Sequence, residues 1–341
     1  MSFGKRLIQA LKFLAFLLVG VVLLWLAFRN IDFRSLSDGL KEARYSWLLL
    51  SLFFGLLAYL IRSRRWILLI HALGFRPSFR NTYHSLMTGY LANIALPRLG
   101  ELTRCVALGK KEKIPVDQLF GTVIIERTID LISVLIIMVV MIFFSGDQTG
   151  SFLNENVFIP LREKIQSVFG FAWIIWILLG SLSALLVILI YILRHSLRKV
   201  RFFAKFFDLA KGIINGLKTI VKMEHKAEFL LYTVLLWLSY ALMTWVVVFA
   251  VESTSHLTFG DGIFLLVIGS LAMSAPVQSG LGVFHFIISR GLYFIDGIKL
   301  EDGLVYAILT HESQLIYVLI AGAISFFVIS GFHSLKNKET D

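Results

Sequence analysis

Strong charges stand inside an otherwise apolar part of the sequence, between residues 93 and 130. Glu126, Arg127 and Asp130 open an apolar run that continues to Phe144. Charged groups at membrane depth cost several kcal/mol unless they pair with one another or face protein or water. Glu126 and Asp130 share a helix face, and Arg127 lies one turn before Asp130, close enough to pair with it. This group is therefore predicted either to bind a charged substrate or to act as a structural latch between helices.

A second charged group precedes it. Arg98, Glu101 and Arg104 follow Pro97, and Pro97 and Gly100 are the predicted break in the chain. Guanidinium groups are suited to binding phosphate oxygens, because their N–H groups form a fork. The carboxylates could hold the arginines in place or meet an amine on the substrate.

The second half of the chain contains another break. Two apolar segments, residues 263–275 and 283–293, are each too short to span a membrane, and a Pro- and Gly-containing stretch separates them. The predicted break residues are Pro276, Gly280 and Gly282. The candidate binding residues around it are Gln278, Ser279, His285, His311 and Glu312. For the two histidines the sequence leaves open a hydrogen-bonded packing role or a proton relay.

Neither a metal site nor a cofactor is predicted. Cys105 is the single cysteine, which excludes an internal disulfide and a cysteine-based zinc site. His311 and Glu312 begin an HExxH pattern, but Leu315 occupies the place of the second histidine.

Composition defines the class of protein. Hydrophobic residues make up 57%, charged residues 16%, and the mean hydropathy is +0.81. These values exclude an ordinary soluble globule and predict a polytopic membrane protein. The net charge of +11 does not indicate a nucleic-acid partner, because the basic residues lie in short loops between apolar runs.

We expect an all-α polytopic membrane protein, with residues 1–341 as a single integral membrane domain. About six full spans and two broken or re-entrant hairpins are predicted, where hydropathy alone counts seven or eight segments. The predicted segments are the run that ends at residue 28, then 47–70, a hairpin around 82–113, 118–144, 173–193, 229–251, the broken pair 263–275 and 283–293, and 305–330. Basic loops place both termini in the cytoplasm, with Arg62, Arg64 and Arg65 near the inner end of the second span.

The most basic part of the chain is residues 194–226. An apolar stripe at helical spacing runs through it, with lysines and arginines off the stripe. We predict a helix at the inner membrane surface, and the alternative is a helix that packs its stripe on the bundle.

The two halves, residues 1–145 and 170–335, show the same order of elements and are joined by an outside loop, 145–170. We expect them to be inverted repeats. Paired interrupted helices in corresponding positions of two halves indicate the substrate site of a transporter. The site is therefore predicted between residues 97–101 and 276–282.

The charged motifs resemble those of a known family. LPRLGELTR, followed by ERTID and by a GLGVF break, is similar to the lysylphosphatidylglycerol synthase transmembrane region, or flippase-like domain family. The resemblance extends from about Trp47 to Ser330. The matching first-half residues are Asn93, Pro97, Gly100, Glu101, Arg104, Glu126, Arg127 and Asp130. The second half departs from the pattern, because members often carry Pro-Gly-Gly-Leu-Gly and a glutamate where this chain has Gln278, Ser279 and His285.

The resemblance implies movement of an anionic phospholipid or a polyprenyl-phosphate-linked lipid between leaflets of the cell membrane. It implies a transport protein rather than an enzyme, and we expect the membrane part without the soluble synthase domain.

Two other classes stay open. One is a scaffold or regulatory subunit for an enzyme of envelope biogenesis. The other is an intramembrane serine hydrolase, in which Ser279 would be activated by His285 or His311. The GxSG pattern of such enzymes is not met, because Val277 stands in place of the first glycine.

Overall fold

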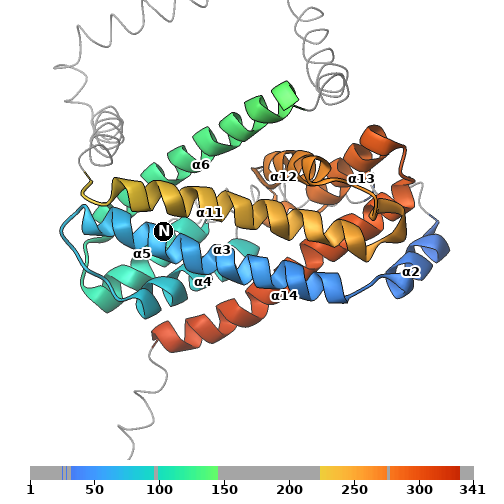
Figure 1. The fold of residues 1–341 in the computed structure, drawn as a ribbon. Helices are drawn as coiled ribbons and strands as arrows, with labels where there is room; N and C mark the ends of the chain where they lie inside the picture. The colour runs from blue at the N-terminus through green and yellow to red at the C-terminus, as the bar shows by residue number, and fades with distance from the viewer. Residues whose placement is uncertain are drawn as a thin grey trace, which may run out of the picture. The chain divides into compact units, whose positions relative to one another are not determined.

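The computed structural model describes residues 32–95, 99–144, 223–274 and 277–330, together with Trp25 and Phe28. All regular elements in these ranges are helical (Figure 1). They are α2 (Phe33–Glu42), α3 (Ser46–His71), α4 (Phe79–Ala95), α5 (Leu99–Glu112), α6 (Val116–Phe144), α11 (Lys226–Trp245), the 3-10 turns η2 (Val246–Ala250) and η3 (Glu252–Thr254), α12 (Phe259–Ser274), η4 (Gln278–Gly280), α13 (Val283–Asp296) and α14 (Leu300–Ser330).

Several of these helices are suited to a bilayer. Among the described residues, α3, α11 extended by η2, and α14 are long and apolar enough to cross, with 26, 25 and 31 residues. On α6, a helix of 29 residues, Leu131, Ile132, Leu135 and Ile136 are exposed. A face of this kind is stable when lipid covers it. The predicted all-α polytopic membrane fold is therefore confirmed.

The first broken hairpin is α4 followed by α5. The break lies between Ala95 and Leu99, and the predicted break residue Pro97 falls outside the described residues. Gly100 already belongs to α5, so its placement in the break was wrong. A Cβ at Gly100 would lie 2.2 Å from the carbonyl oxygen of Gly89, and the Gly100 N–H donates to Oδ1 of Asn93 at 2.7 Å. Gly100 is thus needed for close packing of α5 on α4.

The second broken hairpin is α12 followed by α13, with η4 between them. Ser279, Gly280 and Gly282 have φ angles of 50°, 71° and 81°. These left-handed values interrupt the helix, and glycine adopts them without strain. The predicted break at Gly280 and Gly282 is confirmed, while Pro276 lies outside the described residues.

The described helices follow the predicted order twice: a long helix, a broken pair, and a second long helix. The first set is α3, α4–α5 and α6, and the second is α11, α12–α13 and α14. α3 packs against α11, and α4 packs against α14 (Figure 1). Inverted topology and the side of each loop stay predictions. Several predicted segments lie outside the described residues. They are the first predicted span apart from Trp25 and Phe28, the loop 145–170, the span 173–193 and residues 194–222 of the basic segment.

Candidate functional site

A buried carboxylate joins three helices. Glu126 of α6 is fully buried. Its Oε1 accepts a hydrogen bond from Nε of Arg62 on α3 at 2.8 Å, and its Oε2 accepts one from Nη2 of Arg104 on α5 at 3.0 Å. Nη2 of Arg65, also on α3, lies 3.5 Å from Oε1. Charge-assisted bonds of this kind are the strong class of protein hydrogen bonds.

Asp130 extends the cluster by one helical turn. Its Oδ1 accepts from Nη2 of Arg65 at 2.6 Å, and its Oδ2 lies 3.4 Å from Nη2 of Arg62. The prediction that Glu126 and Asp130 share a helix face is confirmed, because the same two arginines contact both carboxylates.

Arg62 and Arg65 are the site residues that sequence reasoning missed. They were placed with Arg64 near the cytoplasmic end of the second span, yet both are buried, at 5% and 0% exposure. They are buried because α6 supplies their counter-charges within the protein, and their position near the inner end of the span stays a prediction. A signal was present, since Arg62 and Arg65 lie one turn apart on α3 and match the one-turn spacing of Glu126 and Asp130. Arg64, in contrast, is exposed, and its guanidinium carbon lies 4.4 Å from the ring centroid of Phe79.

Arg127 lies at the rim of this arginine–carboxylate cluster. Its side chain is 44% exposed, and its Nη2 lies 3.1 Å from Oε1 of Glu126 and 3.7 Å from Oδ2 of Asp130. The predicted pairing with Asp130 is confirmed, but the buried partners of the carboxylates are other arginines. Arg98 falls outside the described residues.

The cluster has more positive than negative groups. Arg62, Arg65, Arg104 and Arg127 meet two carboxylates, which leaves two positive charges in excess. Nε and Nη1 of Arg65 and Nη1 of Arg104 are buried without a hydrogen-bond partner among the described residues. Glu101 lies one turn before Arg104, and its buried Oε2 also lacks such a partner. Even with an ionised Glu101, one positive charge stays in excess.

Aromatic residues hold the arginines in position. The guanidinium carbon of Arg104 lies 4.6 Å from the ring centroid of Trp66, which is fully buried. Nε1 of Trp66 donates to Oγ1 of Thr122 at 2.8 Å, so the ring links α3 to α6. A cation over an indole face is a favourable contact, and it is stronger away from water.

Tyrosines connect the cluster to the second half of the protein. Nη1 of Arg62 donates to the hydroxyl oxygen of Tyr90 on α4 at 2.6 Å and to that of Tyr240 on α11 at 3.3 Å. Tyr90 in turn packs edge-on against Tyr59, which stacks on Tyr317 of α14 at a centroid distance of 5.5 Å. Contacts between tyrosine side chains therefore connect α4 and α3 to α14.

The candidate residues of the second half form a separate group. Nδ1 of His311 lies 2.9 Å from Oε1 of Glu312, and Nε2 of His285 lies 3.4 Å from the same oxygen. Nε2 of His311 lies 2.7 Å from the carbonyl oxygen of Ser279. Gln278 belongs to η4, which contacts α4, but its side chain is outside the described residues. Within the described ranges, no ion pair or hydrogen bond joins this group to the arginine–carboxylate cluster.

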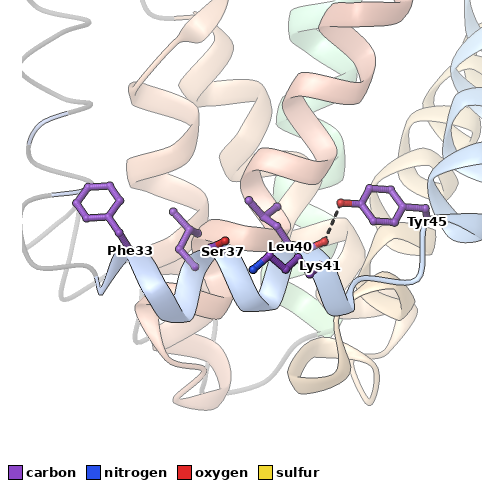
Figure 2. A pocket seen from close by; sticks show the side chains of 6 residues that line it. Phe33, Ser37, Leu40, Lys41 and Tyr45 are labelled. Atoms are coloured by element: carbon purple, nitrogen blue, oxygen red, sulfur yellow. Dashed lines mark hydrogen bonds between the residues drawn. The ribbon is translucent and has the colours of Figure 1, made fainter.

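A shallow pocket lies elsewhere, on α2. Figure 2 shows its lining, and the hydroxyl of Tyr45 donates to the carbonyl oxygen of Leu40 at 2.7 Å. Lys41 is its charged residue. No residue of the arginine–carboxylate cluster lines this pocket, so we do not treat it as part of the candidate site.

The helices and the buried ionic groups define a class: a polytopic α-helical membrane protein with two broken hairpins and charged residues held inside the bundle. The chain belongs to the family described as the lysylphosphatidylglycerol synthase transmembrane region, whose model matches residues 13–322. It is similar to the UPF0104 membrane protein MJ1595 of Methanocaldococcus jannaschii, with 30% identity over 147 residues. That match covers 42% of this chain and 39% of the relative, so it spans about two fifths of the relative's length. No solved structure matches the chain.

Proposed function

We propose that this protein moves a phosphate-bearing anionic lipid between the leaflets of a cell membrane, and that the arginine–carboxylate cluster binds the phosphate. The observation that carries the proposal is that the cluster has more guanidinium groups than carboxylates, with buried, unpartnered N–H groups on Arg65 and Arg104. Buried charges are costly when unpaired, and buried N–H groups are normally hydrogen-bonded. A phosphate group supplies both the missing negative charge and several acceptor oxygens.

A lipid headgroup could reach the cluster at its partly exposed edge, where Arg127 and Asp130 lie. Arg127 is 44% exposed and Asp130 is 16% exposed, whereas Glu126 and Arg65 are fully buried. A headgroup that approaches from this side would meet Arg127 first. The carboxylates keep the inner arginines spaced and oriented, so that the phosphate meets preorganised donors.

The broken hairpins support transport rather than hydrolysis. Interrupted helices in two corresponding positions favour a transporter. For a serine hydrolase, a histidine nitrogen would face the Ser279 hydroxyl, but Nε2 of His311 is instead bonded to the Ser279 carbonyl oxygen.

Reconstitution tests the proposal. The purified chain is placed in liposomes that carry a fluorescent phosphatidylglycerol, and an impermeant quencher reports how much label reaches the outer leaflet with time. We expect faster exchange than in protein-free liposomes and than with a labelled neutral glycolipid that lacks phosphate.

Equal exchange of the phosphate-bearing lipid and the neutral glycolipid would contradict a phosphate site. A second result would overturn lipid movement as the function and favour a scaffold role. In that result, neither phosphatidylglycerol nor a polyprenyl phosphate exchanges faster than in protein-free liposomes.

A further inference from the structure

Three side chains that are common metal ligands lie close together where the start of α13 packs on α14. His285 lies in the first turn of α13, and His311 and Glu312 are adjacent on α14. One donor atom from each lies within 4.8 Å of the other two. Both imidazoles are buried, while the Glu312 side chain is 34% exposed. The sequence predicted these three as candidate binding residues but not as a metal site, because they come from two helices and do not form an HExxH pattern.

The hydrogen bond of His311 determines what its other nitrogen can do. The Ser279 carbonyl oxygen can only accept, so the Nε2 of His311 that bonds to it at 2.7 Å carries the hydrogen. In a neutral imidazole the other nitrogen, Nδ1, then presents a lone pair. This nitrogen faces Oε1 of Glu312 at 2.9 Å. Two lone-pair donors at this distance repel each other unless a cation, either a proton or a metal ion, lies between them.

We propose that His285, His311 and Glu312 bind a divalent metal ion of the Zn²⁺ type. In a tetrahedral zinc site with bonds of about 2.0 Å, donor atoms are about 3.3 Å apart. Nε2 of His285 lies 3.4 Å from Oε1 of Glu312, which fits this spacing. Nδ1 of His311 lies 2.9 Å from the same oxygen, and all three donor atoms lie within 4.8 Å of one another, so metal binding would need side-chain rotation to even out these distances. Two imidazoles and one carboxylate are a known zinc ligand set that leaves a fourth position for water or another oxygen ligand.

The surroundings are those of a ligand group. The bond from His311 to the Ser279 carbonyl is the kind of outer hydrogen bond that orients a metal-bound imidazole. Nδ1 of His285 is buried without a partner among the described residues, so no donor to Nδ1 forces the hydrogen onto Nε2, and Nε2 can present its lone pair to a metal. An ion that enters from outside would first meet Glu312, because its side chain is 34% exposed and both imidazoles are buried. A bound ion would link the first turn of α13 to α14.

Metal binding is tested on the purified full chain without a polyhistidine tag, after dialysis against a chelator. Zn²⁺ is titrated in competition with a chromophoric chelator, and Co²⁺ is used as a spectroscopic probe of tetrahedral coordination. We expect about one Zn²⁺ per chain and a Co²⁺ spectrum of a four-coordinate site. His285→Gln and Glu312→Gln should each weaken Zn²⁺ binding by about 100-fold or more.

His84→Gln is the matched control, because His84 lies on α4 and bonds to Ser325 away from the three ligands. It should bind Zn²⁺ as the unaltered protein does. Absence of stoichiometric Zn²⁺ binding would overturn the proposal and indicate a proton between His311 and Glu312. Binding that survives both ligand substitutions, or that is equally weakened by His84→Gln, would also overturn it. The test does not depend on lipid movement, so it stands or fails independently of the proposed function.

Discussion

Arg104 of α5 and Glu126 of α6 meet at 3.0 Å in the protein interior, although a chain turn and the start of a new helix separate them. The other oxygen of Glu126 faces the arginines of α3. A single carboxylate therefore ties the returning limb of the first hairpin to two long helices. Loss of that carboxylate should affect the packing of all three.

Glu126→Gln should destabilise the protein by about 3–5 kcal/mol, because it removes the shared counter-ion of buried arginines. The change is measured by thermal unfolding in detergent, which is monitored through the exposure of buried tryptophan. Glu228→Gln is the matched control, since Glu228 pairs with His225 on a largely exposed surface. A Glu126→Gln protein as stable as this control would show that the cluster contributes little to the fold.

Arg127→Gln separates a headgroup site from a latch. The carboxylates keep Arg62 and Arg65, so the free energy of unfolding should change by less than about 1 kcal/mol. Lipid exchange should fall by roughly ten- to hundredfold, since a charge-assisted contact to the phosphate is lost. Arg127→Lys keeps the charge without the fork and should retain part of the activity.

The latch hypothesis predicts a different result for the same variant. Stability and exchange would fall together in Arg127→Gln, and both would recover when Glu126 and Asp130 are also neutralised. Such recovery would rule out the headgroup role of Arg127.

Gly100→Ala should disrupt the first hairpin. The new Cβ would lie 2.2 Å from the Gly89 carbonyl oxygen, so α4 and α5 must separate, at a cost of about 1–3 kcal/mol in unfolding free energy. Gly121→Ala on α6 is the control, because nothing lies within 4 Å of its added Cβ. The control should be neutral or slightly stabilising. Equal stability of the two variants would contradict the close packing of α4 on α5.

Glu112 gives the structure a pH-dependent contact at the end of α5. Burial raises the pKa of its carboxyl, but hydrogen bonds from Asn81 and Ser78 outweigh this and hold the pKa below its usual range. A depressed folded-state pKa contributes stability above the unfolded pKa of about 4.3, and this contribution is lost as the pH falls through the folded value.

Wild-type protein should therefore unfold at a higher temperature than Glu112→Gln at about pH 7, and the difference should shrink as the pH falls below about 4. Asn81→Ala should weaken this pH dependence, since Asn81 donates to the carboxylate at 2.7 Å. A difference that is the same at both pH values would contradict the contact.

The sequence was a good guide to the described helices. Hydropathy and the Pro and Gly residues predicted the long helices and the second break, because membrane helices must be apolar and φ values such as that of Gly282 suit glycine. Gly100 was misplaced, since spacing along the chain does not show that a glycine serves packing between helices rather than a bend.

The site was only half predictable. Glu126, Asp130 and Arg104 were recognisable because charges within apolar runs are unusual. Arg62 and Arg65 were interpreted only as basic residues near the inner end of a span, since arginines there usually reach water and the sequence does not show which helix lies opposite. The convergence of His285 with Glu312 likewise depends on how α13 packs on α14.

The most direct test of the account is lipid exchange by Arg104→Gln in reconstituted liposomes. Arg104 carries an unpartnered N–H, and its removal still leaves Glu126 paired with Arg62 and Arg65. We predict a folded protein whose phosphatidylglycerol exchange falls by roughly ten- to hundredfold. Arg64→Gln, an exposed arginine of α3, should exchange lipid at the wild-type rate. Wild-type exchange by a folded Arg104→Gln protein, or an equal loss in Arg64→Gln, would contradict the claim that the buried arginines bind the lipid phosphate.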